Sequence, residues 1–164
     1  MKVVVVYYSK TGNTKSIAKI IAKKSNAKLL PINLLEKKGR GTVEERMKEA
    51  ELFQLALNIS ENVDLVIIGT STSFKQAQSK IRRFTKSVKA NKASLFCTFT
   101  KDVGTTLTEL EKILSENNIT VIGTQEFGGL KTGQFKELKE EERNKYIEKA
   151  EKFAAHCLEK IKST

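Results

Sequence analysis

Five short segments of the chain are almost entirely apolar, and the residues between them follow a different period. These segments are residues 2–8, 29–34, 64–69, 94–99 and 119–124. Their length and their content of β-branched and aromatic residues are typical of strands that are buried on both faces. Residues 64–69, which read Asp-Leu-Val-Ile-Ile-Gly, predict a central strand most strongly.

Between these strands, apolar residues recur at the three- and four-residue spacing of amphipathic helices. The first pattern follows the first strand at once and has lysines on its outer face. The residues that define the five patterns are Ile17, Ala18, Ile20, Ile21 and Ala22; Val43, Met47, Ala50, Phe53 and Leu57; Ala77, Ile81, Phe84 and Val88; Leu107, Leu110, Ile113 and Leu114; and, within residues 139–162, Ile147, Ala150, Ala154, Cys157 and Ile161.

This alternation predicts one α/β domain over residues 1–164: a doubly wound, five-stranded parallel sheet with helices on both faces. Pro31 is the only proline of the chain. Because proline cannot donate to a sheet ladder, its strand belongs at an edge, which fits the strand order 2-1-3-4-5. In that order, strand 2 is added on one side of strand 1 and strands 3 to 5 on the other, so the topological switch point lies between strands 1 and 3. We therefore expect a ligand beyond their carboxyl ends, at residues 9–14 and 70–78.

The loop at residues 9–14 reads Ser-Lys-Thr-Gly-Asn-Thr and joins a strand to the N-terminus of a helix. Unpaired backbone N–H groups and the positive end of the helix dipole attract anions there, and Gly12 lets the amides approach an oxygen closely. A phosphate monoester suits such a loop. The residues alone also allow an ordinary turn, with Asn13 or Thr14 capping the helix.

Other phosphate-binding motifs do not fit this loop. A P-loop needs Lys after Gly12, and a dinucleotide turn needs the GxGxxG spacing. A phosphatase loop needs Cys and Arg, and a receiver domain needs an acidic pair where Tyr7 and Tyr8 stand.

The formal net charge of +11 is unevenly distributed. Residues 1–43 hold a single acidic side chain, Glu36, and residues 75–101 hold none. This distribution predicts a positive side of the molecule, which suits acidic partners. Nucleic acid is a poor match, because Phe84, which the helix pattern buries, is the only aromatic residue between the basic residues Lys75 and Lys92.

The sequence contains few residues that could bind a metal or carry out thiol chemistry. Cys97 and Cys157 lie in apolar patterns without CxxC spacing, so we expect both side chains to act as small buried hydrophobic groups. His156 is the only histidine, and we assign no role to it. No apolar run approaches the length of a membrane span and no secretory signal pattern is present, so we expect a cytoplasmic protein.

At the first loop the sequence resembles the flavodoxin family. Tyr-Tyr-Ser-Lys-Thr-Gly-Asn-Thr is similar to the family's phosphate loop, [ST]-x-T-G-x-[ST] after strand 1. The resemblance continues through Ile-Gly-Thr-Ser-Thr-Ser-Phe after strand 3, Phe-Cys-Thr-Phe at strand 4 and the glycine-rich turn before the last helix, and so covers essentially the whole chain.

The resemblance implies FMN as cofactor, held by three loops. In the first, the hydroxyls of Ser9, Thr11 and Thr14 would meet the phosphate. The residues whose backbone amides the resemblance assigns to the phosphate are Lys10, Thr11, Gly12, Asn13 and Thr14. The second loop would pass one face of the isoalloxazine ring, with Phe74 stacking on it; its residues are Thr70, Ser71, Thr72, Ser73 and Phe74. The third would bring amides to the pyrimidine edge of the ring; its residues are Thr100, Lys101, Asp102 and Gly104.

The chain departs from the flavodoxin pattern in two ways. It has no Trp, so Phe74 or, failing that, Phe99 must supply the stacking ring, and we expect weaker FMN binding than in a well-stacked relative. Its charge is basic, whereas electron-transfer flavodoxins are commonly acidic. The implied function is an electron carrier between redox partner proteins with an acidic docking face, with no catalytic residue of its own. An NAD(P)H-dependent quinone or flavin reductase and a basic binding module without flavin are the alternatives.

Overall fold

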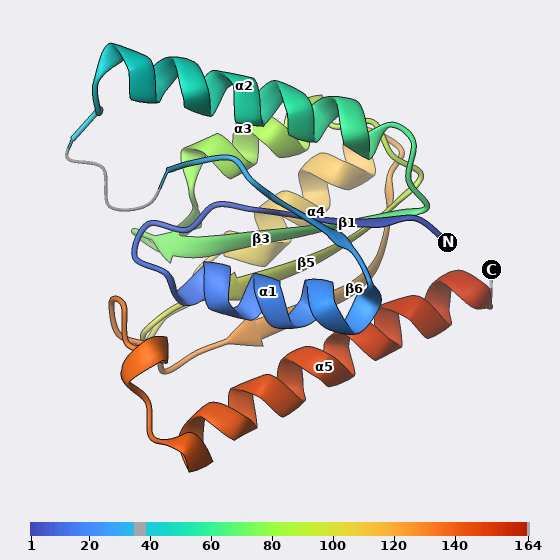
Figure 1. Cartoon of the computed structure of the whole chain (residues 1–164). Coiled ribbons are helices and arrows are strands. Elements are labelled where there is room, and N and C mark those ends of the chain that lie inside the picture. The colour runs from blue at the N-terminus through green and yellow to red at the C-terminus, as the bar shows by residue number, and fades with distance from the viewer. Residues whose placement is uncertain (35–38, 164) are drawn as a thin grey trace.

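A parallel sheet runs through the middle of the molecule in the order β2-β1-β3-β5-β6, as the computed structural model shows (Figure 1). The structure describes residues 1–34 and 39–163. The strands are β1 (Val3–Tyr7), β2 (Lys28–Pro31), β3 (Leu65–Ser73), β4 (Gln76–Ala77), β5 (Lys92–Thr98) and β6 (Thr120–Phe127). The predicted order is confirmed, and Pro31 lies on the edge strand β2, as its missing N–H requires.

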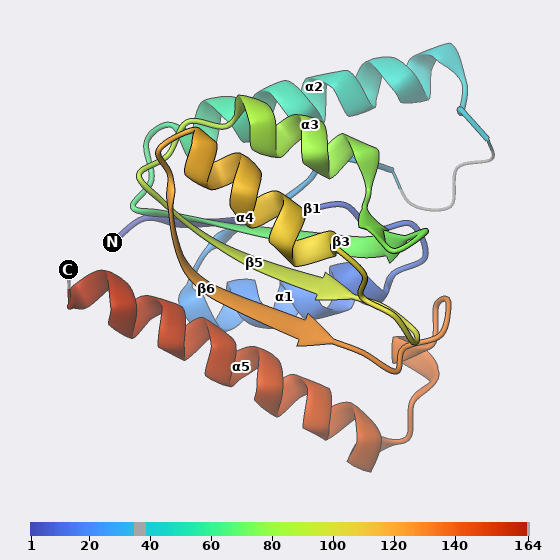
Figure 2. The ribbon, with the colours of Figure 1, turned by 180° about the vertical axis from the view of Figure 1, so that it is seen from behind.

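Helices cover both faces of the sheet (Figure 2). On one face lie α1 (Asn13–Ser25) and α5 (Glu140–Lys162), and on the other α2 (Val43–Ser60), α3 (Ser79–Ser87) and α4 (Thr106–Glu116). A short 3₁₀ helix, η1 (Phe135–Glu137), precedes α5. None of the helices in the described parts of the chain is both long and apolar enough to cross a membrane.

Alternate residues of β1 enter two separate apolar cores. Val3 and Val5 pack into the core beneath α1 and α5, whereas Val4 and Val6 belong to the core beneath α3 and α4. This division is the direct consequence of the two-residue period of a strand. It explains why the central strands read as unbroken apolar runs.

The expectation of a plain loop at residues 70–78 is wrong. β3 continues to Ser73, the chain turns at Phe74 and Lys75, and β4 pairs back antiparallel, with Ser73 opposite Gln76. Five strands were expected, and this two-residue hairpin strand is the sixth. Sequence patterning misses it because β4 is too short to show a period.

The apolar face predicted for α2 is also partly wrong. Val43 and Met47 are 62% and 61% exposed, and the side chain that turns inward from that half of the helix is Glu49, which is buried. α2 covers the edge of the sheet, where β2 is only four residues long, so its first turns have little sheet to pack against. The glycine and charged residues of 36–42 predict a loop, and this stretch lies partly outside the described residues.

Candidate functional site

The loop between β1 and α1 is organised by the side chain of Ser9, which is buried. Its Oγ accepts hydrogen bonds from the backbone N–H of Gly12 (3.2 Å) and of Lys15 (3.1 Å). Gly12 occupies the N-cap position of α1 at a φ of 109°, without a side-chain cap. A turn capped by Asn13 or Thr14 is therefore excluded, and the left-handed backbone at Gly12 explains why glycine stands there.

Four backbone N–H groups of this loop have no hydrogen-bond acceptor within residues 1–34 and 39–163. They belong to Lys10, Thr11, Asn13 and Thr14. Unpaired amides at the positive end of a helix are the standard means by which proteins hold a phosphate oxygen. The loop thus has the donors of an anion site.

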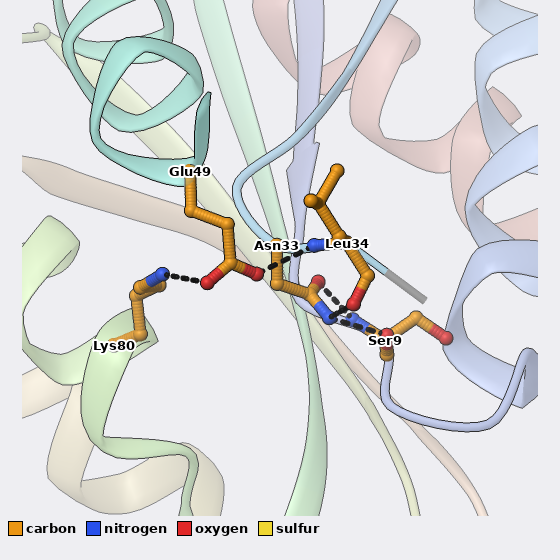
Figure 3. Close-up of polar contacts among 5 residues, drawn as sticks. All are labelled: Ser9, Asn33, Leu34, Glu49 and Lys80. Atoms are coloured by element: carbon orange, nitrogen blue, oxygen red, sulfur yellow. Dashed lines mark hydrogen bonds and ion pairs between the residues drawn. The ribbon is translucent and has the colours of Figure 1, made fainter. Parts of the chain in front are cut away.

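Asn33 fixes this loop from the end of β2. Ser9 donates its N–H to Asn33 Oδ1 (2.9 Å), and Asn33 Nδ2 donates to the carbonyl of Ser9 (2.6 Å), as Figure 3 shows. Both bonds are buried. Sequence reasoning missed Asn33, although a polar residue directly after the apolar run of β2 is a signal that the strand end meets something polar.

Next to Asn33, the backbone N–H of Leu34 donates to Glu49 Oε2 on α2 (2.6 Å). The other oxygen of this buried carboxylate meets Lys80 Nζ of α3 at 3.1 Å (Figure 3). These contacts tie the segment after β2 to two helices of the same face, so the position of Asn33 does not depend on its own bonds alone.

Asn13 joins the loop at residues 9–14 to a segment that sequence reasoning did not place at the site. Asn13 Nδ2 donates to the carbonyl of Lys131 (2.7 Å), and Phe135 donates its N–H to Asn13 Oδ1 (2.9 Å). Thr11 Oγ1 accepts from the N–H of Gly133 (3.2 Å). The loop after β6 thereby forms a third wall of the site.

These loops line a cleft at the carboxyl ends of β1, β3 and β5. Of the fourteen described residues that line it, nine carry hydroxyl groups. The apolar ones are Phe99 and Leu130, and the charged one is Lys10.

Nine of the fifteen residues expected from the sequence line this cleft. They are Ser9, Lys10, Thr11, Asn13, Thr14, Ser71, Thr72, Ser73 and Thr100. The expected residues that do not line it are Gly12, Thr70, Phe74, Lys101, Asp102 and Gly104. Gln78, which also lines the cleft, falls within the expected range 70–78 but was given no role. The lining residues that were not expected there are Thr98, Leu130 and Thr132, together with Phe99, which was named only as a second choice of stacking ring. Thr98 could have been found by the same rule that indicated the first loop, because it ends a strand beside the point where the strand order reverses.

Phe74 lies at the tip of the β3–β4 hairpin, and its side chain is 97% exposed. Both turn residues have left-handed backbones, with φ at 50° for Phe74 and 62° for Lys75. Residues other than Gly, Asn and Asp rarely adopt this backbone conformation, because it costs roughly 1–2 kcal/mol per residue. An exposed aromatic in such a turn is a strained feature that its own contacts do not explain, as is common at functional sites.

The hairpin tip is held by the loop at residues 100–105. Thr105 donates its N–H to the carbonyl of Lys75 (2.9 Å), and Lys75 Nζ pairs with Asp102 Oδ2 at 3.3 Å. Gly104, at a φ of 54°, lies so close that a Cβ would stand 2.1 Å from the Lys75 carbonyl oxygen. The Gly104 N–H is directed to Asp102 Oδ1 (2.8 Å), which together with Lys75 holds the pKa of Asp102 below its usual range.

The two thiols take no part in this site. Both cysteines are buried and free, as expected. Burial, with a smaller effect of Glu126, raises the pKa of Cys97 to about 12, and burial also raises that of Cys157. Neither is a thiolate at neutral pH. No group of three metal-ligating side chains occurs within the described residues.

No protein-family model and no curated protein matches this sequence. Solved structures do match its fold. A flavodoxin from the domain Archaea has 15% identity and a TM-score of 0.59, with 99% of each chain covered. A flavoprotein in complex with FMN from Lactobacillus acidophilus NCFM has 20% identity and a TM-score of 0.52, over 76% of this chain and 92% of that one. An azoreductase from Bacillus anthracis str. Sterne has 13% identity and a TM-score of 0.57, over 94% and 99%.

The fold of this chain is therefore flavodoxin-like. The loop at residues 9–14 and the cleft lie at the reversal of strand order between β1 and β3, where doubly wound folds commonly bind ligands.

Proposed function

We propose that this protein binds one FMN in the cleft and carries electrons between redox partner proteins. The observation that carries the proposal is that Lys10, Thr11, Asn13 and Thr14 all line the cleft, while their backbone N–H groups have no acceptor among the described residues. The FMN bound by the Lactobacillus flavoprotein of similar fold supports the same cofactor.

The phosphate would be held by neutral donors. The Ser9 hydroxyl already accepts two amides, so its own hydrogen is free to point at an anion, and the Thr11 hydroxyl, which accepts from Gly133, has the same freedom. Lys10 is the only charged residue among the described lining residues, and none of them is Arg. A dianion fits because the amides and the helix dipole supply the positive potential.

The ring would lie between the hairpin and the loop after β5. Phe99 lines the cleft and, with Leu130, offers its apolar surface. Phe74 stands at the rim on a strained turn, and we propose that it closes over the outer face of the ring, which accounts for an aromatic in that position. Bound FMN would supply the redox chemistry, while the protein positions it and sets its electrostatic surroundings.

The ring binding should be weak compared with the phosphate binding. Hydroxyl groups dominate the lining, and two apolar side chains cannot enclose a ring of three fused cycles. We therefore expect most of the affinity to come from the phosphate loop.

A second candidate is an enzyme that oxidises NAD(P)H and passes electrons through FMN to a quinone or another flavin. The azoreductase among the similar structures favours it. It needs the same cofactor site, so the two candidates differ in whether the FMN-loaded protein turns over a nicotinamide substrate by itself.

The absorbance spectrum of the freshly purified protein, followed by titration with FMN, tests the proposal. Flavin bands and saturable binding of one FMN per chain are expected. With FMN bound, steady-state oxidation of NADPH in the presence of a quinone would indicate the reductase. A colourless protein that ignores added FMN would contradict both and favour a binding module without flavin.

A further inference from the structure

A second cleft lies between α2 and α3, on the face of the sheet away from α1 and α5. Four cations line it: Arg40 before α2, Arg46 in the first turn of α2, and Lys80 and Arg83 on α3. The flavodoxin-like fold does not call for this concentration of charge, and the proposed FMN site does not use it.

The kind of cation in this cleft is unusual for the chain. Lys supplies 25 of the 30 basic residues and Arg only five, yet three of those five line this cleft. The other two have structural partners: Arg82 pairs with Glu109 at 3.4 Å, and Arg143 donates to the carbonyl of Leu138 at 2.7 Å. Arginine is thus concentrated where its planar, forked set of donors would face a ligand.

Among the residues that the structure describes, the acidic side chains leave most of the positive charge of this cleft unpaired. Glu49 is the acidic residue among the described lining, and it is occupied by Lys80 and by the N–H of Leu34. No carboxylate within residues 1–34 and 39–163 pairs with Arg40, Arg46 or Arg83. Lys80 also lies in the first turn of α3, which has no acidic residue to offset the helix dipole.

Two of the arginines are already oriented. The guanidinium of Arg83 lies over the ring of Phe53, with Cζ 5.5 Å from the ring centroid, and Arg46 Nη1 donates to the carbonyl of Gly41 (3.2 Å). Such contacts reduce the side-chain entropy lost when a ligand binds. They leave further N–H groups of each guanidinium for an acceptor.

We propose that this cleft binds a small molecule through a phosphate or pyrophosphate group, at a site separate from the FMN cleft. Guanidinium groups bind phosphate oxygens in pairs, with two parallel hydrogen bonds each, and a concave surface with three of them suits a compact, multiply charged anion. An acidic protein surface would meet the lysines spread over the rest of the molecule equally well, so it does not explain the arginines.

Isothermal titration of the full chain with inorganic pyrophosphate at 0.15 M salt tests this, in protein saturated with FMN and in protein without it. We expect one site per chain in both, and binding weaker by about tenfold or more in Arg46→Gln/Arg83→Gln. The double variant Arg46→Lys/Arg83→Lys keeps the charge but loses the planar, forked set of guanidinium donors. It should therefore bind pyrophosphate roughly fivefold more weakly than the unaltered protein. The matched control Lys19→Gln/Lys24→Gln removes the same charge from the exposed side of α1 and should bind as the unaltered protein does.

Titration with ADP in place of pyrophosphate tells a nucleotide from an inorganic ligand, since only a nucleotide site gains affinity from the base and sugar. Equal losses in the arginine and lysine variants, or hexaglutamate binding as tightly as pyrophosphate, would show a general electrostatic attraction and overturn the proposal. Loss of pyrophosphate binding on FMN saturation would also overturn it, by placing the ion in the phosphate loop. FMN binding itself is read separately, so failure of the FMN proposal leaves this result interpretable.

Discussion

Asn33 shows how much a single buried amide determines at the site. Its side chain satisfies both the N–H and the carbonyl of Ser9, whose hydroxyl in turn organises the phosphate loop. A buried backbone group that loses its partner costs more than the bond itself contributes. The conformation of the loop therefore depends on a residue 24 positions away in sequence.

Replacement of Asn33 by Leu should lower the free energy of unfolding by about 2–4 kcal/mol, because two buried hydrogen bonds are lost and two backbone groups are left unpaired. FMN affinity should fall as well, since the loop loses its anchor. Urea denaturation and flavin titration measure the two effects. Asn144→Leu, at an exposed position of α5, is the matched control and should change stability by less than about 0.5 kcal/mol. Equal stability of the two variants would contradict the role of Asn33.

Phe74 has a strained backbone and an exposed side chain. Replacing it should therefore have opposite effects on stability and on FMN binding. Phe74→Asn should raise the free energy of unfolding by about 0.5–1 kcal/mol, because Asn tolerates the left-handed region. The same change should weaken FMN binding by about tenfold through loss of the stacked ring. Phe74→Tyr keeps the ring and should leave FMN affinity nearly unchanged. A Phe74→Asn protein that binds FMN normally would show that Phe74 does not contact the flavin.

At the scale of elements, hydrophobic period predicted the five main strands and the five helices, and Pro31 indicated the strand order. The glycine and hydroxyl pattern of residues 9–14 predicts an anion site, and the structure shows unpaired backbone N–H groups there among the described residues. The sequence could not show β4, which is two residues long, or the contacts of Asn13 with residues more than a hundred positions away. It also missed the inward position of Glu49, because nothing in the sequence shows that α2 extends past a four-residue edge strand.

The hairpin and the loop after β5 act as one unit because Gly104 allows their backbones to touch. Gly104→Ala should lower stability through both its positive φ and a clash with the Lys75 carbonyl. Gly39→Ala is a matched control, since Gly39 has a φ of 56° and open space around its Cβ position. We expect a loss of about 1 kcal/mol for Gly39→Ala and about 2 kcal/mol more for Gly104→Ala, by thermal or chemical unfolding. Similar losses in the two would show that the hairpin does not press on Gly104.

For the whole molecule, the net charge of +11 determines how charged electron acceptors approach. With FMN bound and reduced, oxidation by the anion ferricyanide should slow by roughly three- to tenfold between 0.01 and 0.15 M salt, as screening shortens the reach of the positive field. Oxidation by the cation hexaammineruthenium(III) should become faster over the same range. Stopped-flow absorbance measures both rates. Rates that ignore salt would contradict steering by the positive charge.

The central claim is that the loop from Ser9 to Thr14 binds the phosphate of FMN, and a comparison of FMN with riboflavin tests it most directly. The two ligands share the ring and differ by the phosphate. In fluorescence titrations of the unliganded protein, FMN should bind at one site per chain and about 100-fold or more tightly than riboflavin, equivalent to about 2.8 kcal/mol from the loop amides. Equal affinities for the two, or no binding of either, would contradict the account.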